Sequence, residues 1–285
     1  MRKIITRLFV WLGIMAVLTV FGMGLWLVLS GGSQSTESLK WLQLLQTVCT
    51  FLLPPVLCAW LWDADHRPLR WLGLERSASW QVYMLAVAVM LCGLPAINLL
   101  ADLNSRIELP ESLSALEDKL RMQEETAAAL IERFLEAENG WEMLLNIGLM
   151  ALMPALSEEM TFRGVFQQLM SRRSSAVSPR THTAIWVSAF VFSAVHMQFF
   201  GFFPRMLMGA MFGYVFVWTG SLWVPMLMHF TNNSVAIIAY YVSGGGVDEK
   251  NWADTIGAGS TWWLGVLSLM AVGGLLVWLH RLAKR

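Results

Sequence analysis

Residues 141–170 read WEMLLNIGLMALMPALSEEMTFRGVFQQLM. This run is long enough to cross a bilayer as a helix, which takes about 20 largely apolar residues. Its second half nevertheless carries two adjacent carboxylates, Glu158 and Glu159, and a guanidinium, Arg163. A charged group inside a membrane costs at least about 2.5 kcal/mol on insertion scales, so these residues predict a functional site within the bilayer.

The composition of the whole chain also predicts a membrane protein. Of the 285 residues, 56% are hydrophobic and only 14% are charged, which is more apolar than a soluble domain can bury. The 20 basic residues balance the 20 acidic ones, so no net charge attracts the chain to nucleic acid. We therefore expect the lipid bilayer to be part of its solvent and no nucleic-acid partner.

Further apolar runs predict an all-α, polytopic membrane bundle of about eight transmembrane helices. Basic clusters lie next to four of these runs, and with eight spans they all fall on one side, which the positive-inside rule makes the cytoplasm. Both termini are then cytoplasmic. The predicted spans are 8–29, 41–62, 80–100, 141–170, 183–200, 204–218, 222–242 and 262–279, and the clusters are 2–7, 67–76, 172–180 and 281–285.

The chain divides into three predicted parts. Residues 1–140 hold three spans and a polar connector, 141–242 form a catalytic core of four spans, and 243–285 add a C-terminal span. The connector falls outside the cytoplasm in this topology. Within it, 111–137 has leucines at helical spacing, which predicts an amphipathic helix that lies on the membrane or over a site. A solvated connector is the alternative.

The two glutamates differ in their partners. Glu159 and Arg163 have the i, i+4 spacing that lets them neutralise each other along one helix face. Glu158 lies about 100° further round the helix and has no local partner. A buried, unpaired carboxylate suits a general base, because loss of solvent raises its proton affinity. The alternative is a buried ion network that fixes helix packing.

Two predicted spans add polar groups that complete a hydrolytic site. His196 follows Phe192 by four residues, and His229 precedes Asn233 by four, which puts each pair on one helix face. Together these residues offer an orienting imidazole and donors for an oxyanion. The sequence contains no His-Glu-x-x-His zinc motif, its aspartates lie outside the spans, and Ser193 lacks a nucleophile turn. Water activated by a glutamate is the chemistry that remains.

The motifs Glu158-Glu-x-x-x-Arg163, Phe192-x-x-x-His196 and His229-x-x-x-Asn233 resemble those of the type II CAAX prenyl endopeptidase family. This family is also called the CAAX protease and bacteriocin-processing (Abi) family. The resemblance covers roughly residues 141–242. It implies a membrane peptidase in which Glu158 and His196 hold and deprotonate water.

By the same resemblance His229 and Asn233 stabilise the oxyanion, while Glu159 and Arg163 support Glu158. The family is often labelled metalloprotease, and Glu158, His196 and His229 could then bind Zn²⁺. We favour a reaction that is independent of a metal or only weakly dependent on one, because Asn233 is a poor zinc ligand and a good oxyanion donor.

A peptide or protein is the expected substrate, and the bacterial inner membrane is the expected location. Whether the substrate is prenylated, and whether the protein is oligomeric, stay open. Two other functions also stay open. A non-catalytic bacteriocin-immunity or scaffold protein would not need Glu158. A proton- or ion-coupled transporter could use the same buried charges, although the sequence shows no repeated halves.

Overall fold

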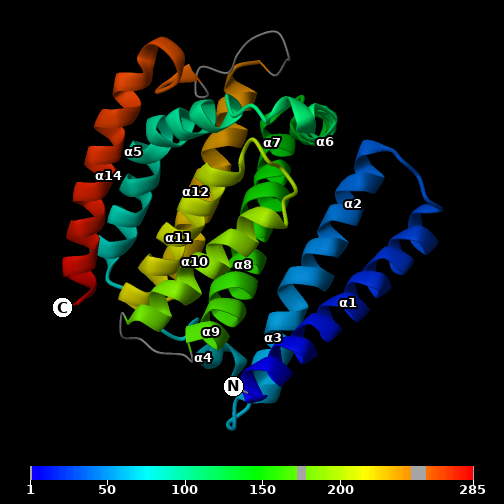
Figure 1. Ribbon diagram of the computed structural model, residues 1–285. Coiled ribbons are helices and arrows are strands. Elements are labelled where there is room, and N and C mark those ends of the chain that lie inside the picture. Colours follow the sequence, from blue (N-terminus) through cyan, green and yellow to red (C-terminus); the bar gives the residue numbers. More distant parts are fainter. Residues whose placement is uncertain (1, 172–177, 245–254, 285) are drawn as a thin grey trace.

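The computed structural model describes residues 2–171, 178–244 and 255–284. Within these residues every regular element is a helix and there is no strand, so the predicted all-α class is confirmed (Figure 1). The first half contains α1 Arg2–Ser30, α2 Thr36–Gln46, η1 Thr47–Leu52, α3 Leu53–Trp62, α4 Pro68–Leu72, α5 Trp80–Ser105, η2 Glu111–Leu113 and α6 Ser114–Leu135. The second half contains α7 Gly140–Ile147, η3 Gly148–Leu152, α8 Met153–Glu159, η4 Met160–Gln167, α9 Gln168–Ser171, α10 Pro179–Ala194, α11 Phe202–Thr219, α12 Trp223–Val242, η5 Gly259–Thr261 and α14 Trp262–Ala283.

Five continuous helical segments are long and apolar enough to cross a membrane. They are Lys3–Ser30, Thr36–Trp62, Trp80–Ser105, Gly140–Ser171 and Gly259–Ala283. The predicted spans 183–200, 204–218 and 222–242 correspond to α10, α11 and α12, which are not among these five. The count of eight spans and the cytoplasmic termini therefore stay predictions. In the basic clusters used for them, Arg172, Arg173 and Arg285 lie outside the described residues.

The helices from α7 to α12 form the centre of the bundle (Figure 1). Helices α5 and α14 pack along each other on one side of this centre, where α5 also contacts α11 and α12. On the other side, α3 contacts η4, while the α1–α2 hairpin leans outward in Figure 1. Both chain ends lie toward the lower side of this view, and α6 lies at the upper side. The central helices, which carry the predicted site residues, are thus held between two outer layers.

Several helices contain prolines, which leave backbone groups without their usual partner within the helix. Side chains from other helices form hydrogen bonds with these groups. Pro55 has no N–H for the Phe51 carbonyl four residues earlier, and the Thr161 hydroxyl donates to that carbonyl at 2.8 Å. Near Pro95 in α5, the Ser268 hydroxyl donates to the Cys92 carbonyl and accepts from the Ala96 N–H. A hydrocarbon environment requires such replacement, because no water is present to bond the freed groups.

The predicted amphipathic helix 111–137 is confirmed as η2 followed by α6. Its exposed side is highly charged, and Phe134 is its buried residue. The prediction of a helix through 183–200 is wrong at its end, because α10 stops at Ala194 and a turn follows. Met197 in this turn has φ +55°, a left-handed conformation that cannot continue a right-handed helix. His196 therefore lies on a turn and not on a helix face.

Candidate active site

The long segment 140–171 is not one regular α-helix. The π-helical turns η3 and η4 lie on either side of α8, and Glu158 and Glu159 are the last two residues of α8. Such turns often occur at functional sites because they widen the helix and re-aim its side chains. Arg163 follows in η4, and its Nη1 donates to Glu159 Oε1 at 2.7 Å. This contact is the i, i+4 pair that the spacing predicts, and both side chains are fully buried.

The Arg163 guanidinium has further partners on α10 and α11. Its Nη2 donates to the Gly209 carbonyl at 2.8 Å, and the group lies 4.7 Å from the centre of the Phe192 ring and 5.4 Å from that of Phe212. A Cβ at Gly209 would lie 3.2 Å from this guanidinium and 3.1 Å from Phe192. Glycine at this position thus lets α11 approach closely enough to bond the buried cation. Sequence reasoning missed this contact between distant helices.

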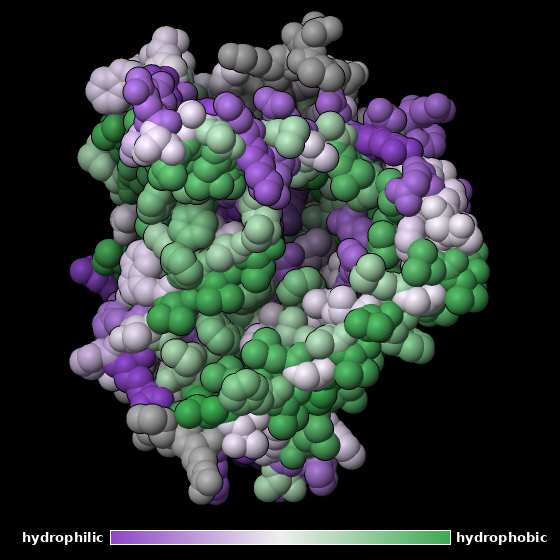
Figure 2. All heavy atoms as spheres, turned by 45° about the vertical axis from the view of Figure 1, so that its right-hand side comes forward, coloured by the Kyte–Doolittle hydropathy of each residue, from purple (hydrophilic) through white to green (hydrophobic). Residues whose placement is uncertain are grey.

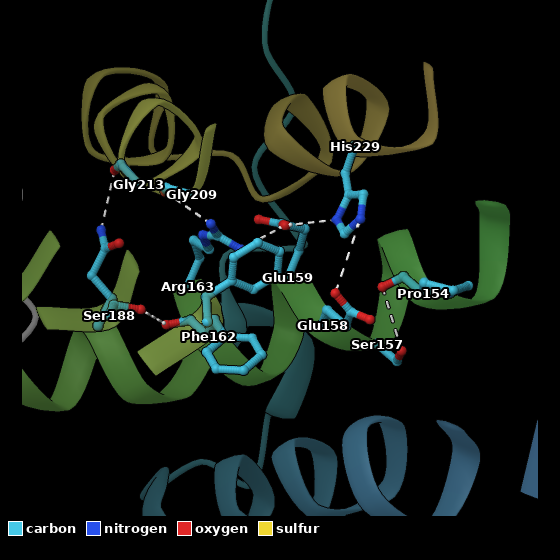
Figure 3. A network of polar contacts seen from close by, with 12 residues as sticks. Pro154, Ser157, Glu158, Glu159, Phe162, Arg163, Ser188, Gly209, Gly213 and His229 are labelled. Carbon is cyan, nitrogen blue, oxygen red and sulfur yellow. Dashed lines mark hydrogen bonds and ion pairs between the residues drawn. The ribbon is translucent and has the colours of Figure 1, made fainter. Parts of the chain in front are cut away.

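His229 of α12 lies between the two glutamates (Figure 3). Its Nδ1 lies 3.0 Å from Glu159 Oε1 and its Nε2 lies 4.0 Å from Glu158 Oε2. Because Glu159 is already the partner of Arg163, Nδ1 must be the donor to this carboxylate. Nε2 is then the ring atom directed at Glu158. It accepts a hydrogen bond when the ring is neutral and donates one when the ring is an imidazolium.

Glu158 keeps an oxygen that no protein group occupies. Its Oε2 is buried and has no hydrogen-bond partner, while the whole side chain is 18% exposed. The two adjacent glutamates therefore have different surroundings, as the sequence predicts. Oε1 of Glu159 is held by a cation and an imidazole, although its Oε2 also lacks a partner, whereas Glu158 Oε2 faces the ring nitrogen of His229 across 4.0 Å. A water molecule can bridge two groups at that separation.

His196 approaches the same region from the turn after α10. Its Nδ1 lies 2.7 Å from the Phe192 carbonyl, so Nδ1 is the donor and Nε2 is free to accept. The Phe192 ring packs against both imidazoles, with centres 5.1 Å from His196 and 6.1 Å from His229. Phe192 thus links the two histidines. No direct hydrogen bond joins His196 to Glu158 among the described residues.

Side chains from α5 and α6 hold the turn that carries His196. The buried Asn104 amide donates to the Phe199 carbonyl at 3.0 Å and accepts from the Phe203 N–H at 2.9 Å. The Phe200 N–H donates to Glu124 Oε2 at 3.0 Å. These contacts join residues that lie 76 to 99 positions apart, so no local sequence signal could have shown them.

Asn233 lies one turn after His229 on α12, as predicted, but its side chain is bonded to other groups. Its Nδ2 donates to the Met150 carbonyl at 3.3 Å, and its Oδ1 accepts from Asn232. Pro154 has no N–H to offer that same Met150 carbonyl, four residues earlier. Asn233 therefore replaces a backbone hydrogen bond between α12 and η3. In this arrangement it serves helix packing, and one amide hydrogen remains for another acceptor.

The alternative zinc ligands Glu158, His196 and His229 do not form a metal site in this arrangement. No group of three His, Cys, Asp or Glu side chains is close enough to hold a metal ion within residues 2–171, 178–244 and 255–284. The reaction without metal stays a prediction.

One face of the molecule is hollowed. Figure 2 shows a largely hydrophobic face with a depression near its centre, and hydrophilic residues lie inside the depression.

Comparison with known proteins supports the resemblance seen in the motifs. Residues 140–235 match the family model described as "Type II CAAX prenyl endopeptidase Rce1-like". Over 94 residues the chain is 31% identical to "Uncharacterized protein YpbD" of Bacillus subtilis (strain 168). That alignment covers 32% of this chain and 43% of the Bacillus protein. No solved structure matches the chain.

The family match confirms the predicted resemblance over these residues. It includes Glu158, Glu159, Arg163, Phe192, His196, His229 and Asn233. The matched residues begin after α5 and α6. The residues of these helices that hold the His196 turn therefore belong to a part of the chain without a family match. Five helical segments are long and apolar enough to span a membrane, and residues 140–235 are similar to a family of membrane proteases.

Proposed function

We propose that this protein is a membrane-embedded endopeptidase that hydrolyses a peptide bond with water activated by Glu158. The observation that carries the proposal is the pair formed by Glu158 Oε2 and His229 Nε2 at 4.0 Å. Two groups at this distance can hold one water between them. The carboxylate takes the proton of that water as it attacks the carbonyl carbon of the substrate, and it gives this proton to the amine nitrogen when the tetrahedral intermediate collapses and the C–N bond breaks.

The surrounding residues support this chemistry by fixing His229. Glu159 accepts from Nδ1 of the ring and is itself held by Arg163, so Nε2 stays directed at Glu158. This arrangement corresponds to the triad logic in which a third group orients the histidine. An imidazolium at His229 would donate from Nε2 to the oxyanion of the tetrahedral intermediate.

His196 and Asn233 have less direct roles in the proposal. The free Nε2 of His196 can accept from the water or from a protonated leaving group, since its Nδ1 is bonded to Phe192. Asn233 offers the oxyanion the amide hydrogen that is not bonded to the Met150 carbonyl. Its contribution is therefore separable from that of Glu158 by experiment.

The substrate in this proposal is a peptide or protein at the membrane, and the location is a bacterial inner (cytoplasmic) membrane. Purified wild-type protein in detergent should cleave members of a mixed peptide pool, with the new ends identified by mass spectrometry. Glu158→Gln protein should leave the pool intact. An immunity protein, scaffold or transporter would give no cleavage with either form.

A further inference from the structure

A cavity lies directly beside His196, between α6 and the turn after α10. Its volume is about 340 Å³. Its wall includes Met122, Thr126, Ala127 and Leu130 of α6 and His196 and Met197 of the turn. The cavity therefore joins a candidate active-site residue to a helix outside the family match.

The wall of this cavity is mainly apolar and accessible. The exposed fractions are 60% for Met122, 70% for Met197 and 41% for Leu130. Large apolar side chains are costly to leave in water, and methionines adapt their shape to different partners. The volume lies at the lower end of the range for small-ligand sites, so it suits one side chain better than a folded domain.

The cavity opens at a polar boundary of the protein. In 101–142, which includes α6, eleven acidic residues outnumber four basic ones, so α6 does not lie in hydrocarbon. Glu124 bonds the Phe200 N–H, and the Arg121 guanidinium lies 4.1 Å from the centre of the Phe200 ring. These contacts hold α6 against the His196 turn. Figure 1 shows α6 on the side of the bundle opposite the chain ends.

We propose that this cavity is a substrate subsite that receives one apolar side chain of the peptide, and that the peptide arrives from the α6 side of the membrane. The inference rests on the proposed function. A side chain held there places its own backbone next to His196, which lines the cavity. With the termini in the cytoplasm, as the basic clusters predict, the substrate comes from outside the cytoplasm.

The first test measures binding and the side of access without relying on turnover. Thr126→Cys is introduced together with Cys92→Ser, because Cys92 is the exposed native cysteine and Cys49 and Cys58 are buried. A membrane-impermeant maleimide should label Thr126→Cys in intact cells, and a leucine-rich peptide should slow the labelling at least fivefold. Labelling only in inside-out vesicles would overturn the direction of access.

The matched control for this test is Ala129→Cys, which is exposed on α6 but does not line the cavity. Its labelling should be unaffected by the peptide. If lipid or detergent chains protect Thr126→Cys and the peptide does not, the cavity is a lipid contact and the subsite proposal is wrong. This outcome is independent of whether any peptide is cleaved.

The second test measures specificity. Once a cleaved bond is known, peptides with Leu or Gly beside that bond are compared for Ala127→Trp, which fills the cavity, and for Ala129→Trp as control. Ala127→Trp should lower kcat/KM for the Leu peptide about tenfold and should change the Gly peptide little. Equal effects of the two variants, or equal losses for both peptides, would contradict the subsite. Absence of cleavage by wild-type protein would instead contradict the proposed function.

Discussion

Glu159 Oε1 lies 3.0 Å from His229 Nδ1 and 2.7 Å from Arg163 Nη1, so one carboxylate oxygen serves both a buried cation and an imidazole. The ion pair within the 140–171 segment thereby orients a residue of α12. This relationship separates the two adjacent glutamates, because Glu158 lies on the far side of the same ring, 4.0 Å from its Nε2.

The first prediction concerns the stability of the Glu159–Arg163 pair. Glu159→Gln leaves Arg163 as a buried cation without its counter-charge, which should lower the free energy of unfolding by about 3–5 kcal/mol. Replacing both residues by neutral ones should recover part of that loss, because the unpaired charge is gone. Melting temperatures in one detergent check this. A Glu159→Gln protein that is stable but inactive would assign Glu159 to the chemistry.

The second prediction concerns the contacts that hold the His196 turn. Asn104→Ala or Glu124→Gln should lower kcat about tenfold or more with a smaller change in KM, because His196 loses its fixed position. The reaction of His196 with diethyl pyrocarbonate, mapped by mass spectrometry, should become faster. Glu125→Gln is the control, since Glu125 is the exposed neighbour of Glu124. Unchanged kcat in all three variants would show that the turn needs no such support.

The third prediction separates two roles of Asn233. If the residue mainly replaces the hydrogen bond that Pro154 cannot make, Asn233→Ala should lower the melting temperature and leave kcat of the remaining folded protein within about threefold. If it binds the oxyanion, kcat should fall by about 100-fold or more at nearly unchanged stability. The contact with Met150 leads us to expect the first result. Parallel melting and rate measurements decide between them.

The fourth prediction concerns metal. The described side chains do not gather into a zinc site, so treatment with a strong chelator should leave most of the activity. The measurement is the cleavage rate before and after chelation, with the zinc content determined in the same samples. Stoichiometric zinc whose removal abolishes activity and whose return restores it would make Glu158, His196 and His229 ligands.

The sequence predicted those features that depend on local spacing. The apolar runs, the amphipathic helix α6 and the Glu159–Arg163 pair follow from periodicity and from the i, i+4 rule. The π-helical turns on either side of α8 could not be read this way, and at the first of them the Met150 carbonyl, which Pro154 cannot bond, is bonded by the distant side chain of Asn233. Periodicity also failed to show the end of α10, since apolar residues continue into the turn.

Long-range contacts account for the remaining differences. The position of His229 between the two glutamates arises from packing of α12 against α8, which no spacing within one helix encodes. The hydrogen bonds of Asn104 and Glu124 with the segment after α10 likewise depend on packing between distant helices. Sequence patterns identified which residues are unusual in a membrane, and the structure showed how these residues are combined.

The most direct measurement of the central claim is the cleavage rate of Glu158→Gln protein at wild-type stability. The substitution keeps the size of the side chain and removes the base, so turnover should fall below detection while the melting temperature stays near that of the wild type. Expression and membrane insertion should also be unchanged, because among the described residues the ion-pair partner of Glu158 is His229, at 4.0 Å. A Glu158→Gln protein that cleaves peptide at the wild-type rate would contradict the account.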